Sequence, residues 1–159
     1  MAPEIHGVLV VIFNPKTSKF LLQERADGKG LVFPGGGFDF SEAPETAVRR
    51  ELFEELGIEL PISEVFGILI QRKKVENSLI FGFLHLFFIE TTEEKDFEFK
   101  LDPTETLSVH WLSLDEILNQ ELPMLATKRI AVLFDGFRLN QTPITGKLGE
   151  PVGYQGLAI

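Results

Sequence analysis

Residues 36–58 read GGFDFSEAPETAVRRELFEELGI, and our prediction of the fold starts from this stretch. Pro44 suits the first turn of a helix, where a missing N–H costs nothing, and Gly57 suits the left-handed position after the last turn. Between them, apolar residues recur at helical spacing, at Val48, Leu52 and Leu56. The stretch therefore predicts a helix that begins at Pro44, ends before Gly57 and packs one face on a core.

The neighbouring face of this helix is acidic. Glu51, Glu54 and Glu55 fall together on it, because residues three and four apart are neighbours on a helix. Such clustered carboxylates repel one another unless they are fully solvated or hold a cation. Ahead of the helix, residues 33–37 form a glycine-rich turn whose carbonyls could join the carboxylates around Mg²⁺, which takes about six oxygen ligands. A solvated surface remains the ordinary alternative for a glutamate-rich face.

The same stretch resembles the Nudix signature, G-x5-E-x7-R-E-U-x-E-E-x-G-U, in which U is a bulky aliphatic residue. All its fixed positions are filled, by Gly36, Glu42, Arg50, Glu51, Leu52, Glu54, Glu55, Gly57 and Ile58. The resemblance to the Nudix hydrolase family implies an enzyme that cleaves diphosphate linkages with Mg²⁺ or Mn²⁺. It also implies an α/β fold, the Nudix-type α/β/α sandwich with a mixed, partly barrel-like sheet.

The resemblance implies roles for the residues of the signature. The expected metal ligands are Glu51, Glu54, Glu55 and the main-chain carbonyl of Gly35. Glu51 is also expected to act as the general base. Arg50 resembles the family's arginine that does not bind the metal itself but orients a carboxylate such as Glu42.

Family members often supply one further acid from a loop beyond the signature. Glu105, which precedes the predicted strand around Trp111, is our candidate for this catalytic acid, with Glu98 and Glu94 as rivals. The ordinary alternative for each of the three is a surface carboxylate.

Two residues are candidates for binding the substrate. Arg25 ends a predicted strand just before the loop at residues 27–30 and could meet a phosphate, although a surface ion pair with Glu24 or Asp27 is the alternative. Phe38 could stack on a base, but most phenylalanines lie in cores.

Composition predicts a single soluble domain spanning residues 1–159, in which the glycine- and proline-containing tail 140–159 has no assigned structure. The N-terminus MAPEIHG lacks the features of a signal peptide, and the chain has no cysteine, so we expect a cytoplasmic enzyme. The net charge of −9 argues against a nucleic-acid surface or a membrane partner. The expected partner is therefore a small nucleotide substrate. The net charge does not decide between a monomer and a homodimer.

Periodicity on both sides of the signature predicts the remaining elements. We expect a second long helix at residues 123–137, a short one near 114–119, and strands at residues 6–13, 20–25, 31–33, 65–72, 79–90, 97–101 and 109–112.

The substrate is the least constrained prediction. Markers of the ADP-ribose, dinucleoside polyphosphate, NADH and coenzyme A subgroups are not visible, which leaves nucleoside triphosphates and nucleotide sugars among nucleoside diphosphate derivatives. We favour nucleoside triphosphates because the chain is short. A non-catalytic Nudix-fold nucleotide sensor is the other class, although such proteins usually lose glutamates that this chain keeps.

Overall fold

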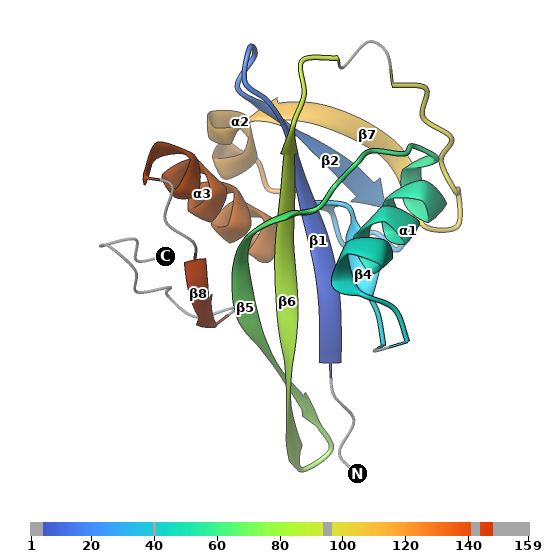
Figure 1. The fold of residues 1–159 in the computed structure, drawn as a ribbon, viewed down its shortest axis with the longest axis vertical. Coiled ribbons are helices and arrows are strands. Elements are labelled where there is room, and N and C mark those ends of the chain that lie inside the picture. The colour runs from blue at the N-terminus through green and yellow to red at the C-terminus, as the bar shows by residue number, and fades with distance from the viewer. Residues whose placement is uncertain (1–4, 40, 94–96, 141–143, 148–159) are drawn as a thin grey trace.

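The computed structural model describes residues 5–39, 41–93, 97–140 and 144–147. In chain order the elements are β1 (Ile5–Asn14), β2 (Lys19–Arg25), β3 (Leu31–Val32), β4 (Gly35–Gly37), α1 (Pro44–Leu56), β5 (Glu64–Val75), β6 (Ser78–Glu90), β7 (Thr106–Ser113), α2 (Leu114–Asn119), α3 (Leu125–Asn140) and β8 (Ile144–Lys147) (Figure 1).

One mixed sheet joins all the strands in the described part of the chain. Its order is β3-β2-β1-β6-β5-β8, with β4 paired to β1 and β7 paired to β2. β1 runs parallel to β6, whereas β5 and β6 form an antiparallel hairpin. The predicted mixed sheet is confirmed, and among the described strands it stays open between β3 and β8 instead of closing into a barrel.

The two faces of β1 build two cores, because successive side chains of a strand point to opposite faces. Val8, Val10 and Ile12 pack with α1, while Val11 and Phe13 pack with α3. Figure 1 shows α1 on one side of the sheet and α2 with α3 on the other. The predicted α/β/α sandwich is therefore confirmed.

Gly57 ends α1 and also fixes where the next segment can pass. Its φ of 69° is the left-handed conformation expected after a helix, and its N–H donates to the Phe53 carbonyl at 2.8 Å. A Cβ at this position would collide with Lys100, whose own N–H donates to the Leu56 carbonyl at 2.8 Å. The end of α1 therefore anchors the irregular segment that leads to Glu105.

The predicted strand at residues 97–101 is wrong. This segment is irregular and does not join the sheet. Its alternating apolar side chains pack on the core between α1 and the sheet, which we call the α1-side core. Phe97 stacks on Trp111 with ring centroids 6.2 Å apart. Alternation predicted the burial of one side correctly, but alternation alone does not show that a segment pairs with a neighbouring strand.

Other elements also differ from the predictions, and residues 35–37 of the predicted glycine-rich turn form the strand β4. β7 begins at Thr106, because it pairs with β2 over its whole length, and the last long helix begins at Leu125. In the tail that had no assignment, β8 pairs in parallel with β5 from Ile144 to Lys147. Residues 141–143 and 148–159 lie outside the described residues, as does Glu94. In the described part of the chain, no helix combines the length and the apolar character needed to cross a membrane.

Gly57→Ala should lower the free energy of unfolding by about 2–3 kcal/mol, because it adds a clash with Lys100 to the cost of a left-handed alanine, which alone is roughly 1–2 kcal/mol. Gly28→Ala is the matched control. Gly28 has a φ of 80°, and an added Cβ would have no atom within 4 Å. Urea denaturation of both variants measures the difference. Equal losses would mean that the contact with Lys100 contributes nothing.

Candidate active site

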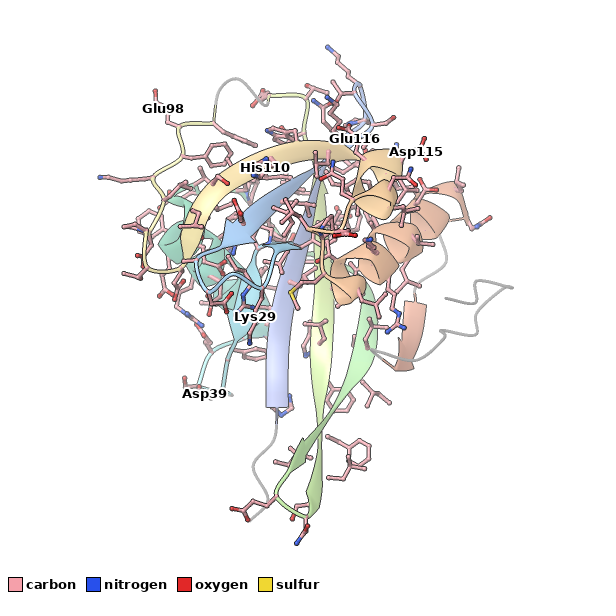
Figure 2. All side chains as sticks on the ribbon, turned by 180° about the vertical axis from the view of Figure 1, so that it is seen from behind. Lys29, Asp39, Glu98, His110, Asp115 and Glu116 are labelled. Atoms are coloured by element: carbon pink, nitrogen blue, oxygen red, sulfur yellow. The ribbon has the colours of Figure 1, made fainter. Side chains whose placement is uncertain are left out.

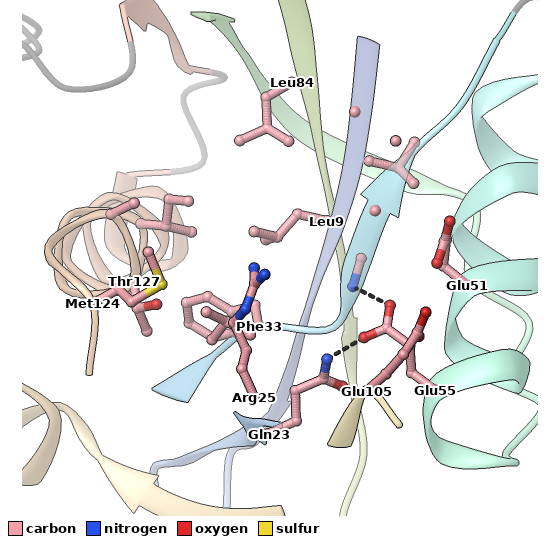
Figure 3. Close-up of a pocket in the computed structure, with 18 of the residues that line it drawn as sticks. Leu9, Gln23, Arg25, Phe33, Glu51, Glu55, Leu84, Glu105, Met124 and Thr127 are labelled. Carbon is pink, nitrogen blue, oxygen red and sulfur yellow. Dashed lines mark hydrogen bonds between the residues drawn. The ribbon is translucent and has the colours of Figure 1, made fainter. Parts of the chain in front are cut away.

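A cavity of about 730 Å³ lies between α1 and the beginning of α3, over the glycine-rich strand β4 (Figure 3). Residues far apart in sequence line it: Gln23 and Arg25 on β2, Gly35, Gly36 and Gly37 on β4, Glu51 and Glu55 on α1, Glu105 before β7, and Met124, Thr127 and Ile130 near the start of α3. The cavity thus collects most of the predicted site residues.

Glu55 is the buried carboxylate of the cavity, with 3% of its surface exposed. It accepts a short hydrogen bond from Gln23 Nε2 and another from the Gly35 N–H at 3.2 Å. Burial raises the pKa of Glu55 to about 8, and the nearby charges of Glu51 and Glu105 add to this rise against the two hydrogen bonds. A positive charge placed in the cavity would therefore stabilise the ionised form of Glu55.

Glu51 lies against the backbone of β4. Its side chain is 13% exposed, and burial raises its pKa against the opposing charge of Arg50. A Cβ added at Gly36 would sit 2.6 Å from the carboxylate carbon of Glu51. Gly36 is therefore needed for Glu51 to take this position, whatever the backbone conformation of the glycine.

Arg50 joins three carboxylates of the signature. Its Nε and Nη2 donate to Glu42 at 2.7–3.1 Å, and its Nη1 donates to Glu51 at 3.1 Å and to Glu54 at 3.2 Å. These partners, with Glu42 first, raise the pKa of Arg50 above its ordinary value despite partial burial. The side chain of Glu54 is 52% exposed and does not line the cavity, so the structure brings only Glu51 and Glu55 together among the three predicted glutamate ligands.

The two predicted residues at the mouth of the cavity are Arg25 and Glu105. Arg25 makes the ion pair with Asp27 that was the alternative for this residue, and it also lines the cavity; its contact with a phosphate stays a prediction. The hydrogen bond from Arg25 to Asp27 raises the pKa of the arginine. Glu105 is exposed and lines the cavity, and its carbonyl accepts from the Ala26 N–H at 2.9 Å. The rival Glu98 lies at the outer rim of its segment (Figure 2).

Phe38 does not line the cavity. Its ring packs on the α1-side core, with its centroid 5.7 Å from that of His85 and 6.1 Å from that of His6. The structure therefore places Phe38 in an aromatic cluster beside β4 and gives no support to base stacking.

Gln23 is a site residue that the sequence reasoning missed. It is only 4% exposed, its amide nitrogen donates to Glu55, and its Oε1 has no hydrogen-bond partner among the described residues. A signal existed in FLLQER, since Gln23 shares a strand face with the buried Leu21. A polar residue at an inward position of a strand requires a buried partner.

The residues of the cavity fit a hard divalent cation. The carboxylates of Glu51 and Glu55 and the carbonyls of β4 offer oxygen ligands, and a bound cation would offset the burial that raises the pKa of Glu55. No three Asp, Glu, His or Cys side chains in the described part of the chain converge on one point. The protein would therefore supply part of the ligand shell, with water and phosphate oxygens completing it, as is usual for Mg²⁺.

Comparisons with known proteins assign the fold to a family. The NUDIX domain matches residues 4–133. A MutT-like protein from Streptomyces ambofaciens is 28% identical over 153 residues, which cover 96% of this chain and 92% of that protein. A putative 8-oxo-dGTP diphosphatase from Bacillus subtilis is 33% identical over 107 residues, which cover 67% of this chain and 65% of that protein.

The NUDIX domain of NrtR from Shewanella oneidensis, solved with ADP ribose, superposes with a TM-score of 0.70. The identity is 18%, with 88% of this chain and 91% of that chain covered, so this likeness concerns the fold alone.

Glu55→Gln should stabilise the metal-free protein at alkaline pH. The pKa of Glu55 is about 8 in the folded state and near its ordinary 4.5 when unfolded. The folded state therefore binds more protons between these values, and wild-type stability falls as pH rises from about 4.5 to about 8. Glutamine removes this loss. We expect the melting temperature of the variant in EDTA to exceed that of wild type at pH 9 but not at pH 5, by differential scanning fluorimetry. Glu54→Gln, at an exposed position, should show no such trend. A difference independent of pH would contradict the burial of a charged Glu55.

Gly36→Ala should leave the fold intact but displace the carboxylate of Glu51, because the colliding atoms are the end of a flexible side chain. Gly35→Ala is the contrasting variant, since its Cβ would meet the rigid main chain of Val8 and Leu9. We expect the melting temperature to fall by less than about 3 °C for Gly36→Ala and by about 8 °C or more for Gly35→Ala. The first shift corresponds to a loss in the free energy of unfolding below roughly 1–2 kcal/mol, and the second to a loss above it. Similar melting temperatures would refute this placement of β4.

Proposed function

The chain belongs to the NUDIX family of pyrophosphohydrolases, and on this premise we propose that it hydrolyses nucleoside triphosphates with a divalent cation, Mg²⁺ or Mn²⁺. The observation that carries the proposal is the pair of carboxylates of Glu51 and Glu55, one half-buried and one buried, which line one cavity together with the glycines of β4. Nudix hydrolases generally need divalent ions, and this pair is where the chain offers oxygen ligands to one.

Each residue of the site has a proposed role. Glu51 and Glu55 hold the cation, together with the Gly35 carbonyl and with Glu54 once its contact with Arg50 is exchanged. When bound, the cation neutralises the charge of the diphosphate and favours attack by water.

The remaining roles concern orientation and proton transfer. Arg50 keeps the carboxylates of Glu42 and Glu51 oriented. Arg25, at the mouth of the cavity, binds a phosphate when it leaves Asp27. Glu51 is the first candidate for the general base, and Glu105 is the second, because both line the cavity.

The choice of substrate draws on the relatives. The Bacillus subtilis relative carries the name of an 8-oxo-dGTP diphosphatase, which favours a nucleoside triphosphate. A nucleotide-sugar diphosphatase and a non-catalytic nucleotide sensor remain the alternatives. The cytoplasmic location and the homodimer stay predictions.

A screen of product release tests the function directly. Purified protein is incubated with nucleoside triphosphates, nucleotide sugars and dinucleotides in Mg²⁺ or Mn²⁺, and pyrophosphate and phosphate are quantified. We expect pyrophosphate from triphosphates. A folded protein that binds a nucleotide but cleaves no substrate with either ion would favour the sensor.

Arg50→Lys should lower kcat by about 10- to 100-fold with little change in KM, as is typical when an outer partner of a metal ligand is lost. Lysine keeps the charge but cannot reproduce the planar contacts to Glu42, Glu51 and Glu54. Arg49→Lys is the control, because the exposed Arg49 donates to the main-chain carbonyl of Glu45 in its own helix and, among the described residues, to no carboxylate. Steady-state kinetics of both variants give the result. Wild-type kcat in Arg50→Lys would reduce Arg50 to a surface ion pair.

A further inference from the structure

Gln23 is a buried amide at a position where an apolar side chain would serve the fold. It lies in β2 between Val32 of β3 and Val109 of β7, so strands on both sides hold its backbone. The residue is 4% exposed, and Leu21 on the same face of the strand is fully buried. The amide oxygen of Gln23 has no hydrogen-bond partner among the described residues. Because burying such an atom opposes folding, the fold alone does not account for an amide here.

The amide nitrogen of Gln23 has a partner, the carboxylate of Glu55. It donates to Oε2 of Glu55, while the N–H of Gly35 donates to Oε1 at 3.2 Å (Figure 3). A carboxylate can accept about four hydrogen bonds or metal contacts on its two oxygens. The two donors therefore fix the orientation of the Glu55 carboxylate and still leave lone pairs on both oxygens for a cation.

The donor that Gln23 supplies is also neutral. A lysine or arginine at this position would place a positive charge beside Glu55 and would compete with a cation for the carboxylate. A glutamate would instead bring a second acceptor and a like charge. Glutamine holds Glu55 without doing either, and so leaves the charge of the carboxylate to be balanced by a bound ion.

We propose that Gln23 is a positioning residue of the cation site, whose amide holds the carboxylate of Glu55 in the orientation that binds the divalent ion. The inference rests on the part of the proposed function that places a cation at Glu51 and Glu55. It goes beyond that part because Gln23 lies outside the signature, on another element of the sheet, and acts on the cation only through Glu55.

The test measures binding of Mn²⁺ to the purified protein without substrate, by isothermal titration calorimetry. Gln23→Met keeps the length of the side chain and removes both the donor to Glu55 and the buried amide oxygen. We expect Kd for Mn²⁺ to rise about tenfold or more, as is typical when an outer partner of a metal ligand is lost. The melting temperature in EDTA should stay within about 4 °C of wild type, because the two losses act on stability in opposite directions.

Thr106→Val is the matched control. Thr106 is 1% exposed, its hydroxyl oxygen has no hydrogen-bond partner among the described residues, and it does not line the cavity. The variant therefore removes a buried polar oxygen of the same kind but no donor to Glu55, and its Kd for Mn²⁺ should equal that of wild type. An equal rise of Kd in both variants would overturn the inference, because the effect would then come from any change in the core.

Steady-state kinetics with a nucleoside triphosphate separate this role from contact with the substrate. In Gln23→Met, the Mn²⁺ concentration that gives half the maximal rate should rise about tenfold, while KM for the nucleotide at saturating Mn²⁺ stays unchanged.

The outcomes distinguish this inference from the proposed function. An unchanged Kd for Mn²⁺ in folded Gln23→Met would overturn the inference and leave the proposed function standing. A wild-type protein that binds no Mn²⁺ and cleaves no diphosphate substrate would overturn the proposed function, and this inference with it. Gln23→Leu takes the place of Gln23→Met if the latter does not fold. Failure of both variants to fold would assign Gln23 to the stability of the sheet and would also overturn the inference.

Discussion

The carboxylate of Glu55 is the constraint on which the site depends. It lies inside the protein, and its two hydrogen bonds come from different parts of the chain, Gln23 on β2 and the Gly35 main chain on β4. Leaving a buried polar group without hydrogen-bond partners costs about 1–3 kcal/mol, and the cost is higher when the group is charged. The contacts of Glu55 therefore tie α1 to β2 and β4, in addition to the apolar packing of that helix on the sheet.

The glycines of β4 follow from the same constraint. Once Glu55 and Glu51 point at the strand, its backbone must approach both α1 and β1 closely. A Cβ at Gly36 would enter the space of the Glu51 carboxylate, and one at Gly35 would enter the main chain of β1. The glycine-rich turn and the acidic helix are thus one structural unit, and a change in either part displaces the other. This coupling explains why carboxylates and glycines occur together in a single short stretch of sequence.

Sequence patterns predicted the parts of the structure that short-range rules control. Helical spacing, Pro44 and Gly57 gave α1 with its correct ends, and alternation gave most of the strands. The failures have longer-range causes. Residues 97–101 alternate because one side of them packs on the core, although they do not join the sheet. The role of Gln23 depends on Glu55, which lies 32 residues away. The apolar part of the cavity wall could not be predicted, because Leu9, Leu84 and Ile130 come from β1, β6 and α3, and no local pattern shows that these three elements meet.

The burial of Glu55 also links stability to occupancy of the site. Burial raises the pKa of Glu55, so the folded protein disfavours the ionised form that a cation would bind. A cation bound there would restore this loss, since any ligand of the folded state alone stabilises it by RT ln(1 + [L]/Kd). Arg50 cannot supply the missing charge, because Glu42, Glu51 and Glu54 already occupy its donors on the outer side of the cluster. Arg25 also lines the cavity, but it pairs with Asp27, which leaves the buried carboxylate of Glu55 to be neutralised by a proton or by a bound ion. Competition between these two is the physical basis on which activity at this site would depend on both pH and metal concentration.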